Sequence, residues 1–170
     1  MAAQFPHITW WCPQLPPSPK AAAALIAEGT ASWPADRMAV IGSSLGGFYA
    51  TWLAALRGCK AALLNPAINP ARDLAKYIGE QSAWHDPAER FYFAPEFVDE
   101  LRALQAGPLP HPERVWALIA KGDEVLDWRE MTARYPGSQQ VVLEGGDHAI
   151  SNFDQYLPQL LEFLDLQPAP

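Results

Sequence analysis

Three residues of the types used in acyl transfer occur along the chain in the order serine, aspartate and histidine. Ser44 lies at the centre of a Gly-x-Ser-x-Gly pattern, Asp123 follows Lys-Gly, and His148 ends the segment Gly-Gly-Asp-His. A serine hydroxyl becomes a good nucleophile when a neutral imidazole takes its proton, and a carboxylate orients that imidazole and stabilises the imidazolium. We therefore expect Ser44 to be a nucleophile, His148 its general base and Asp123 the orienting acid.

The glycines around Ser44 fit a tight turn between a strand and a helix. A short apolar run precedes the turn, and a helix that is apolar on all sides follows it. Gly42 and Gly46 are expected to be needed because a Cβ would clash in such a strained turn, and Gly47 is expected to let the helix pack close to the sheet. In this nucleophile elbow the hydroxyl is held at the end of the sheet, where the N–H of Leu45 and the helix dipole can stabilise an oxyanion.

Other residues compete for these roles. Ser43 is the neighbouring hydroxyl, but it falls at the wrong place in the elbow, and Glu124 and Asp127 are competing acids. Asp123 itself could be an ordinary turn residue. The remaining histidines lie at the wrong end of the predicted sheet or in an insertion: His7, His85 and His111. The histidines form no metal-binding motif, and no Lys-Ser or Lys-Thr pair follows the glycines, so neither a metal site nor a phosphate-binding loop is expected.

The elements that must position these residues alternate between strands and helices. Five apolar or β-branched runs are predicted to be strands: His7–Cys12, Met38–Ser43, Ala61–Asn65, Val115–Ala120 and Gln140–Glu144. Helices are predicted over Lys20–Glu28, Phe48–Arg57, Pro95–Ala106, Asp127–Tyr135 and a last apolar stripe within Phe153–Leu164. Alternation of this kind favours an α/β fold, and the order Ser, Asp, His is that of α/β-hydrolases. We expect an α/β-hydrolase-like, mostly parallel sheet flanked by helices, with the three loops gathered at its carboxyl edge.

Capping residues mark two of the predicted helix starts. Ser18 is expected to N-cap the first helix, with Pro19 at its first position and Gly29 closing it. Ser151 and Asp154 have the spacing of a capping box at the start of the last helix.

Residues 67–112 separate the third and fourth predicted strands and contain many aromatic side chains. We expect this segment to be a short helical insertion near the active site. Trp84, Phe91 and Phe93 suggest an apolar substrate-binding pocket, and the alternative is that these aromatic side chains are ordinary core residues.

Composition narrows the class of protein. At 170 residues the chain is expected to be one domain, 1–170, and its net charge of −7 argues against nucleic acid or an anionic membrane as a partner. No apolar run approaches the roughly 18 residues of a membrane span, and the N-terminus lacks the basic and apolar regions of a signal peptide. Cys12 and Cys59 form no Cys-x-x-Cys pattern and are expected to be buried, reduced thiols, as in a cytoplasmic protein.

Six ordered motifs extend over nearly the whole chain. They are Pro13–Pro17, Ile41–Gly47, Tyr49–Trp52, Asn65–Pro66, Gly122–Asp127 and Glu144–Ala149. Together they resemble the YqiA-like esterases, which are small bacterial α/β-hydrolases. The resemblance implies a hydrolase of carboxylic esters or acyl thioesters that needs no cofactor, and it implies the same roles for Ser44, Asp123 and His148.

The chain departs from that family pattern at its start. The family resemblance implies an extra strand at the start, which ends in a His-Gly-Phe type loop and is followed by a helix. This chain contains neither that strand and loop nor the complete helix. The absent strand would lie between the predicted strands 7–12 and 38–43, and its loop would donate a second N–H to the oxyanion. Three explanations follow: a truncated reading frame, which we favour, direct pairing of the two flanking strands, or a partner chain in the slot, as in a homodimer.

Two functions from different classes follow from these observations. The first is a serine esterase or thioesterase that forms an acyl-enzyme on Ser44. The alternative is a non-catalytic or degraded hydrolase-fold module that binds an acyl ligand or a partner, because the oxyanion strand is missing. A dienelactone hydrolase would want a cysteine in the elbow, and peptidases of this fold usually have a larger domain over the site.

Overall fold

Four parallel strands form the central sheet of the protein. In the computed structural model, which describes residues 5–82, 88 and 90–166, their order is β1-β2-β5-β6. The strands are β1 (Ala39–Ser43), β2 (Lys60–Leu64), β5 (Val115–Ala120) and β6 (Gln139–Leu143). Each neighbouring pair is parallel. Four of the five predicted strands are therefore confirmed, each to within one residue.

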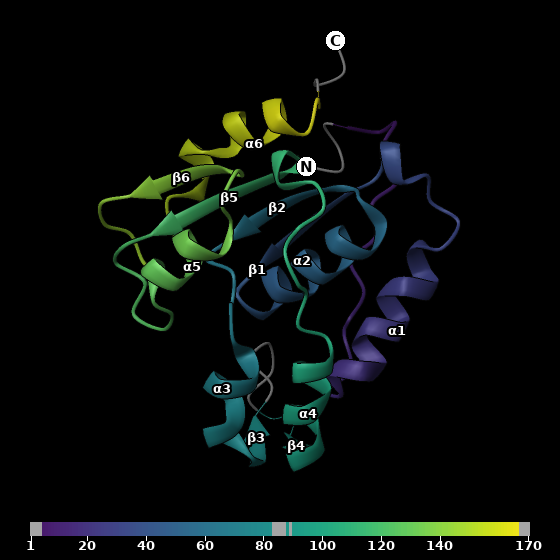
Figure 1. Ribbon diagram of the computed structural model, residues 1–170, viewed down its shortest axis with the longest axis vertical. Coiled ribbons are helices and arrows are strands. Elements are labelled where there is room, and N and C mark those ends of the chain that lie inside the picture. Colours follow the sequence, from purple (N-terminus) through teal and green to yellow (C-terminus); the bar gives the residue numbers. More distant parts are fainter. Residues whose placement is uncertain (1–4, 83–87, 89, 167–170) are drawn as a thin grey trace.

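Helices cover both faces of this sheet (Figure 1). On one face lie α2 (Leu45–Arg57) and α5 (Trp128–Arg134), and on the other lies α6 (Leu157–Phe163). Side chains alternate between the two faces along β2. Ala61 and Leu63 pack in the core on the side of α2 and α5, and Ala62 packs in the core on the side of α6. All six residues of β5 are buried, as expected for a central parallel strand covered on both sides.

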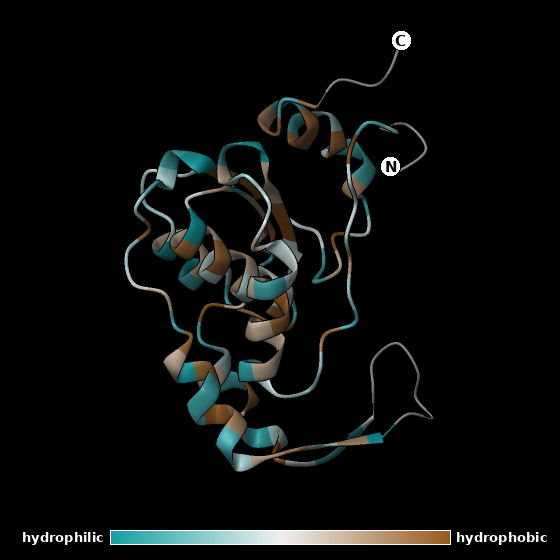
Figure 2. Cartoon of the chain, turned by 90° about the vertical axis from the view of Figure 1, so that its right-hand side faces the viewer, coloured by the Kyte–Doolittle hydropathy of each residue, from teal (hydrophilic) through white to brown (hydrophobic). Residues whose placement is uncertain are grey.

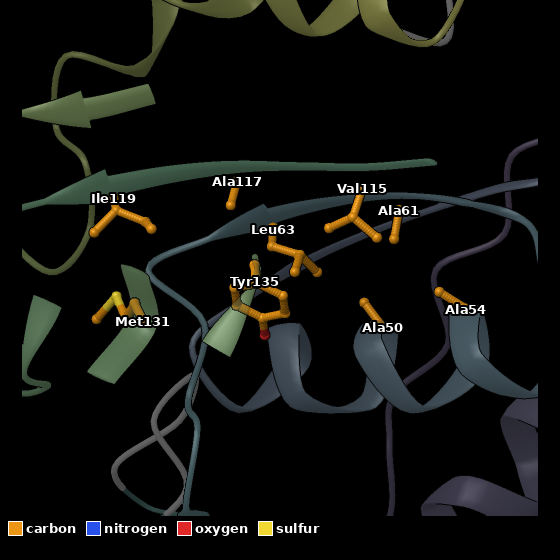
Figure 3. Packing of buried hydrophobic residues seen from close by; sticks show 9 residues of the cluster. All are labelled: Ala50, Ala54, Ala61, Leu63, Val115, Ala117, Ile119, Met131 and Tyr135. Carbon is orange, nitrogen blue, oxygen red and sulfur yellow. The ribbon is translucent and has the colours of Figure 1, made fainter. Parts of the chain in front are cut away.

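The core cluster on the α2 side of the sheet packs alanines of α2, and side chains from α5 and its C-terminal end, against residues of β2 and β5 (Figure 3). Its buried members are Ala50, Ala54, Ala61, Leu63, Val115, Ala117, Ile119, Met131 and Tyr135. The alanines of α2 let its backbone lie close to the strands, and the helix begins at Leu45, one residue after Ser44.

The segment between β2 and β5 forms the predicted insertion at one end of the molecule, away from the sheet (Figure 1, Figure 2). It contains α3 (Pro70–Leu74), α4 (Pro95–Ala103) and an antiparallel pair, β3 (Gly79–Ser82) and β4 (Arg90–Phe93). It packs on α1 (Pro19–Thr30) and α2 through a separate apolar cluster between these helices and α4. Short 3₁₀ turns cover Ala35–Arg37, Ala75–Tyr77, Pro112–Arg114 and Phe153–Gln155.

The predicted strand His7–Cys12 is wrong, because this segment is irregular. Trp10 and Trp11 are each 39% exposed, and Cys12 is exposed rather than buried. A β-rich sequence becomes a strand only where a neighbour can pair with it. Within the described residues β1 pairs with β2 alone, so the flanking strands do not close the gap by direct pairing, and β1 has an open edge.

The helix boundaries confirm some of the capping signals and correct others. Ser18 caps α1 by accepting a hydrogen bond from the N–H of Ala21 at 3.1 Å. Gly29 does not close α1, which continues to Thr30. A Cβ on this glycine would overlap the indole ring of Trp11, so Gly29 gives the ring its place.

The helices α4 and α6 are shorter than predicted. The helix predicted over Pro95–Ala106 ends at Ala103. The predicted capping box of Ser151 and Asp154 does not form, because α6 begins at Leu157 and the N–H of Ser151 instead donates to a carboxylate oxygen of Asp147 at 3.0 Å. Among the described residues, no helix combines the length and the apolar character needed to cross a membrane.

Candidate active site

Ser44 stands at the junction of β1 and α2 in a conformation that non-glycine residues rarely adopt. Its φ and ψ are 53° and −122°. Two backbone hydrogen bonds join it to the turn after β2. Its N–H donates to the carbonyl of Leu64 at 3.0 Å, and its carbonyl accepts from the N–H of Ala67 at 2.9 Å. The turn after β2 therefore fixes the elbow from both sides.

The glycines of the elbow differ in what they do. A Cβ on Gly42 would overlap the carbonyl oxygen of Gly46, and a Cβ on Gly47 would lie 2.7 Å from the Cβ of Pro66. Gly42 is thus required by the tight turn, and Gly47 allows α2 to approach the loop that follows β2. The expectation for Gly46 is wrong, since no atom of the described residues, apart from its chain neighbours and the nearby backbone of α2, lies within 4 Å of the Cβ that it lacks.

The side chains of Ser44, Asp123 and His148 form one hydrogen-bonded series. The imidazole Nε2 lies 3.0 Å from Ser44 Oγ, and Nδ1 lies 2.9 Å from Oδ2 and 3.0 Å from Oδ1 of Asp123. An ionised carboxylate can only accept hydrogen bonds, so we assign the proton to Nδ1, which leaves the Nε2 lone pair facing the serine hydroxyl.

The carboxylate of Asp123 is fixed by its own loop. Oδ1 accepts hydrogen bonds from the N–H groups of Val125 at 2.8 Å and Leu126 at 2.9 Å, and the side chain is fully buried. A carboxylate held by two backbone donors keeps its orientation toward the imidazole.

The loops after β5 and β6 approach each other closely enough for this contact. The N–H of Gly122 donates to the carbonyl of Gly145 at 3.2 Å, and a Cβ on Gly122 would overlap the carbonyl oxygen of Gly146. Since β5 and β6 are neighbouring parallel strands, their following loops share one edge of the sheet. Gly122 thus removes the steric barrier between the Asp123 loop and the His148 loop.

A family model described as "Uncharacterised protein family (UPF0227)" matches residues 1–165. The chain belongs to this family. It is the family of YqiA-like proteins that the six sequence motifs indicate.

Solved structures similar to this UPF0227 protein are α/β-hydrolases. The α/β superfamily hydrolase from Oenococcus oeni PSU-1 is 15% identical, with 90% of this chain and 77% of that chain covered and a TM-score of 0.59. The monoacylglycerol lipase of Paleococcus ferrophilus is 17% identical, with coverages of 86% and 75% and a TM-score of 0.60. The mouse alpha/beta hydrolase domain-containing protein 10 is 16% identical, with coverages of 84% and 70% and a TM-score of 0.58. At this identity the likeness establishes the fold alone.

The competing acids of the UPF0227 chain have other partners. Glu124 accepts a hydrogen bond from the backbone N–H of His148 at 3.0 Å, and Asp127 caps α5 by accepting from the N–H of Arg129 at 2.8 Å. Ser43 is the last residue of β1.

The competing histidines lie elsewhere in the chain. His7 belongs to the irregular segment near the N-terminus, and His111 contacts Glu113 through Nδ1 at 3.2 Å. His85 lies outside the described residues.

A cavity of about 100 Å³ opens beside Ser44. It is lined by Ser44, Leu45, Ala67, Asp73, Leu74, Lys76, Tyr77, Val125 and Leu126. The structure does not bring the predicted substrate-binding residues Phe91 and Phe93 to this cavity, because they pack in the apolar cluster between α1, α2 and α4. Trp84 lies outside the described residues.

The oxyanion donor expected at Leu45 is the first amide of α2. Amides in this position have no acceptor within their own helix, so the N–H is available to a ligand beside Ser44. Within the described residues no strand lies beyond β1, so no loop after such a strand supplies a second donor. No group of three or more His, Cys, Asp or Glu side chains in that part of the chain could hold a metal ion.

Proposed function

We propose that this UPF0227 protein is a serine hydrolase that cleaves carboxylic esters or acyl thioesters through an acyl-enzyme on Ser44. The hydrogen-bonded series from Ser44 through His148 to Asp123, at the carboxyl edge of a parallel sheet, is the observation that carries this proposal. A serine, an imidazole and a carboxylate in this order are the groups needed for nucleophilic acyl transfer.

The reaction proceeds in two halves. Oγ of Ser44 attacks the carbonyl carbon while Nε2 of His148 takes its proton, and the N–H of Leu45 donates to the oxygen that becomes negative. The tetrahedral intermediate then collapses, and the imidazolium returns the proton to the departing alcohol or thiol. Water repeats the attack on the acyl-enzyme, with His148 again as base, and releases the acid. Asp123 stabilises the imidazolium in both halves.

The cavity beside Ser44 favours a small ester with an apolar acyl group. Its volume is about 100 Å³, and Leu45, Leu74 and Leu126 supply apolar walls. The lipase from Paleococcus ferrophilus is, by its name, a hydrolase of monoacylglycerols, and this supports an ester as the substrate class.

The test is hydrolysis of p-nitrophenyl butyrate by the chain and by its Ser44→Ala variant. Removal of the nucleophile is expected to lower kcat by a factor on the order of 10⁶, down to background. Ser43→Ala is the matched control, because it removes the neighbouring hydroxyl, and its kcat is expected to stay within a few-fold of the parent. A serine-directed phosphonate is expected to label Ser44. Hydrolysis of butyrylthiocholine tests whether the protein also cleaves thioesters.

A different result would support the second candidate. If both the parent chain and Ser44→Ala are folded by circular dichroism and neither hydrolyses either substrate, the proposal fails. The open edge of β1 and the single oxyanion donor would then favour a non-catalytic module that binds an acyl ligand or a partner.

A further inference from the structure

Asn65 is the buried polar residue of the turn that follows β2. Its side chain is fully buried, and its backbone has a φ of 39°, in the left-handed region that asparagine tolerates better than most residues. Burial of a primary amide is unfavourable unless its donors and its acceptor are all satisfied, so the partners of this side chain define its role.

The amide of Asn65 has partners in two other loops. Nδ2 donates to the carbonyls of Asp147 and His148, each at 3.0 Å, and Oδ1 accepts from the N–H of Ala120 at 2.8 Å. Ala120 ends β5, from which the chain continues to Asp123. One side chain therefore joins the end of β2, the end of β5 and the loop that carries the imidazole.

The backbone on either side of Asn65 holds Ser44. Leu64 and Ala67 each make a backbone hydrogen bond to Ser44. The turn 64–67 thus contacts the elbow of Ser44 through its main chain. Through the side chain of Asn65 it contacts the end of β5, which leads to Asp123, and the loop that carries His148.

The backbone of His148 is held on both sides. Its carbonyl accepts from Asn65, and its N–H donates to the carboxylate of Glu124 at 3.0 Å. Neither side chain touches the imidazole in these contacts. Both act on the position of the main chain from which the imidazole projects.

We propose that Asn65 and Glu124 are positioning residues that hold the backbone of His148 at the distance from Ser44 that proton transfer requires. This inference rests on the proposed hydrolase function. Two successive carbonyl oxygens converge on one nitrogen, and the two N–H groups of a primary amide satisfy both. We call these contacts of Asn65 and Glu124 with the backbone of His148 the clamp. A misplacement of about 1 Å in a reacting group can lower the rate by about 10²-fold, so loss of the clamp reduces kcat while leaving the substrate cavity in place.

The first test is Asn65→Asp. The substitution keeps the size and the acceptor for Ala120, but it replaces the two donors by an oxygen that faces two carbonyls. We expect kcat to fall by about 10–10²-fold at neutral pH, with KM within a few-fold of the parent. A merely structural role would lower the amount of folded enzyme without this separation of kcat from KM.

The pH profile gives a second readout of the same variant. Burial favours the neutral form of the introduced carboxyl group, which can donate one hydrogen bond to these carbonyls, and its ionisation sets charge against them. We expect the ratio of parent to variant kcat to increase as the pH rises. The titratable groups of the contacted loops are common to both proteins: Lys121, Asp123, Glu124, Asp127, Glu144, Asp147 and His148. Hydrogen bonds from Ser151 lower the pKa of Asp147, so this carboxyl group stays ionised.

Asn69→Asp is the matched control. Asn69 is exposed and caps α3 by accepting from the N–H of Arg72 at 3.2 Å, a role that aspartate also fills. The same change of chemistry is expected to leave kcat and its pH profile unchanged there.

If Asn65→Asp does not fold, Glu124→Ala tests the other half of the clamp at an exposed position. A fall in kcat of several-fold with an unchanged KM is expected. Parent-like kcat in Glu124→Ala, or in a folded Asn65→Asp at every pH, overturns the inference while the parent remains active and dependent on Ser44. Failure of the proposed function looks different, because the parent chain itself would then be inactive.

Discussion

At the scale of single residues, backbone conformation sets the position of each reactive group. Ser44 has a φ of 53°, which is costly for a serine and is held by hydrogen bonds to Leu64 and Ala67. Asp123 takes its orientation from two amides of its own loop. The geometry of the candidate site therefore depends on backbone groups of Leu64, Ala67, Val125 and Leu126 as well as on the three side chains.

The elbow glycines give a prediction at this scale. Gly42→Ala is expected to lower the free energy of unfolding by about 1–3 kcal/mol and to reduce kcat, because the new Cβ overlaps the carbonyl oxygen of Gly46. Gly46→Ala is the control. It adds a Cβ where the described residues leave space, in the first turn of α2, and is expected to leave stability unchanged or raised by up to about 1 kcal/mol. Urea unfolding measures both, and an equal loss in the two variants would contradict the steric explanation.

At the scale of elements, a buried hydrogen bond joins α2 to the end of α5. Thr51 Oγ1 donates to the carbonyl of Gly47 at 2.8 Å and lies 2.9 Å from the hydroxyl of Tyr135. Since the threonine proton is already used, the tyrosine hydroxyl is the donor of the second bond. Tyr135 is 1% exposed, and burial raises the pKa of its phenol above the ordinary value of about 10.

This bond predicts a dependence of stability on alkaline pH. Because the pKa of Tyr135 is raised by folding, the native state binds more protons than the unfolded state above about pH 10, so this contribution to stability is present below that pH and is lost above it. Tyr135→Phe is expected to cost about 1 kcal/mol at neutral pH through the lost hydrogen bond, and the deficit should shrink as the pH rises above about 10.

Urea unfolding of both proteins between neutral and alkaline pH measures this difference. Tyr92→Phe provides the control, because Tyr92 is 58% exposed and the same atoms are removed without disturbing a buried bond. A deficit in Tyr135→Phe that is constant across the pH range would show that ionisation of this phenol does not contribute.

At the scale of the whole molecule, β1 is one of the two edge strands of the described sheet, and β6 is the other. The outer backbone groups of β1 have no partner strand in the described part of the chain, and Ile41 of this strand is 40% exposed. Unpaired strand edges with apolar side chains pair readily with other chains. The molecule is therefore expected to self-associate through β1 as its concentration rises.

Ile41→Lys tests this expectation. A charged side chain on an edge strand opposes pairing, so light scattering should show less association than in the parent chain. Leu56→Lys is the control, because Leu56 is a 58% exposed leucine on α2 rather than on an edge strand. An equal effect of the two lysines would point to general surface hydrophobicity and not to the strand edge.

The sequence by itself determined the order of the site and the class of fold. Ser44, Asp123 and His148 each follow an apolar run, and parallel strands bring the loops after such runs to one edge. Buried strands need apolar side chains along their length, so the pattern of apolar residues marks where strands lie. For this reason four strands were predicted to within one residue.

Tertiary structure decided what local sequence could not. The segment 7–12 has the composition of a strand, but a strand exists only where another pairs with it, and this segment has no such neighbour in the described sheet. Asp123, Glu124 and Asp127 compete for one role in the sequence, and the structure gives each a different hydrogen bond: Asp123 to the imidazole of His148, Glu124 to the backbone N–H of His148, and Asp127 to the N–H of Arg129 in its own helix. The sequence predicts Asn65 only as the end of a strand. Its hydrogen bonds to residues more than fifty positions away form only when the fold brings the loops together.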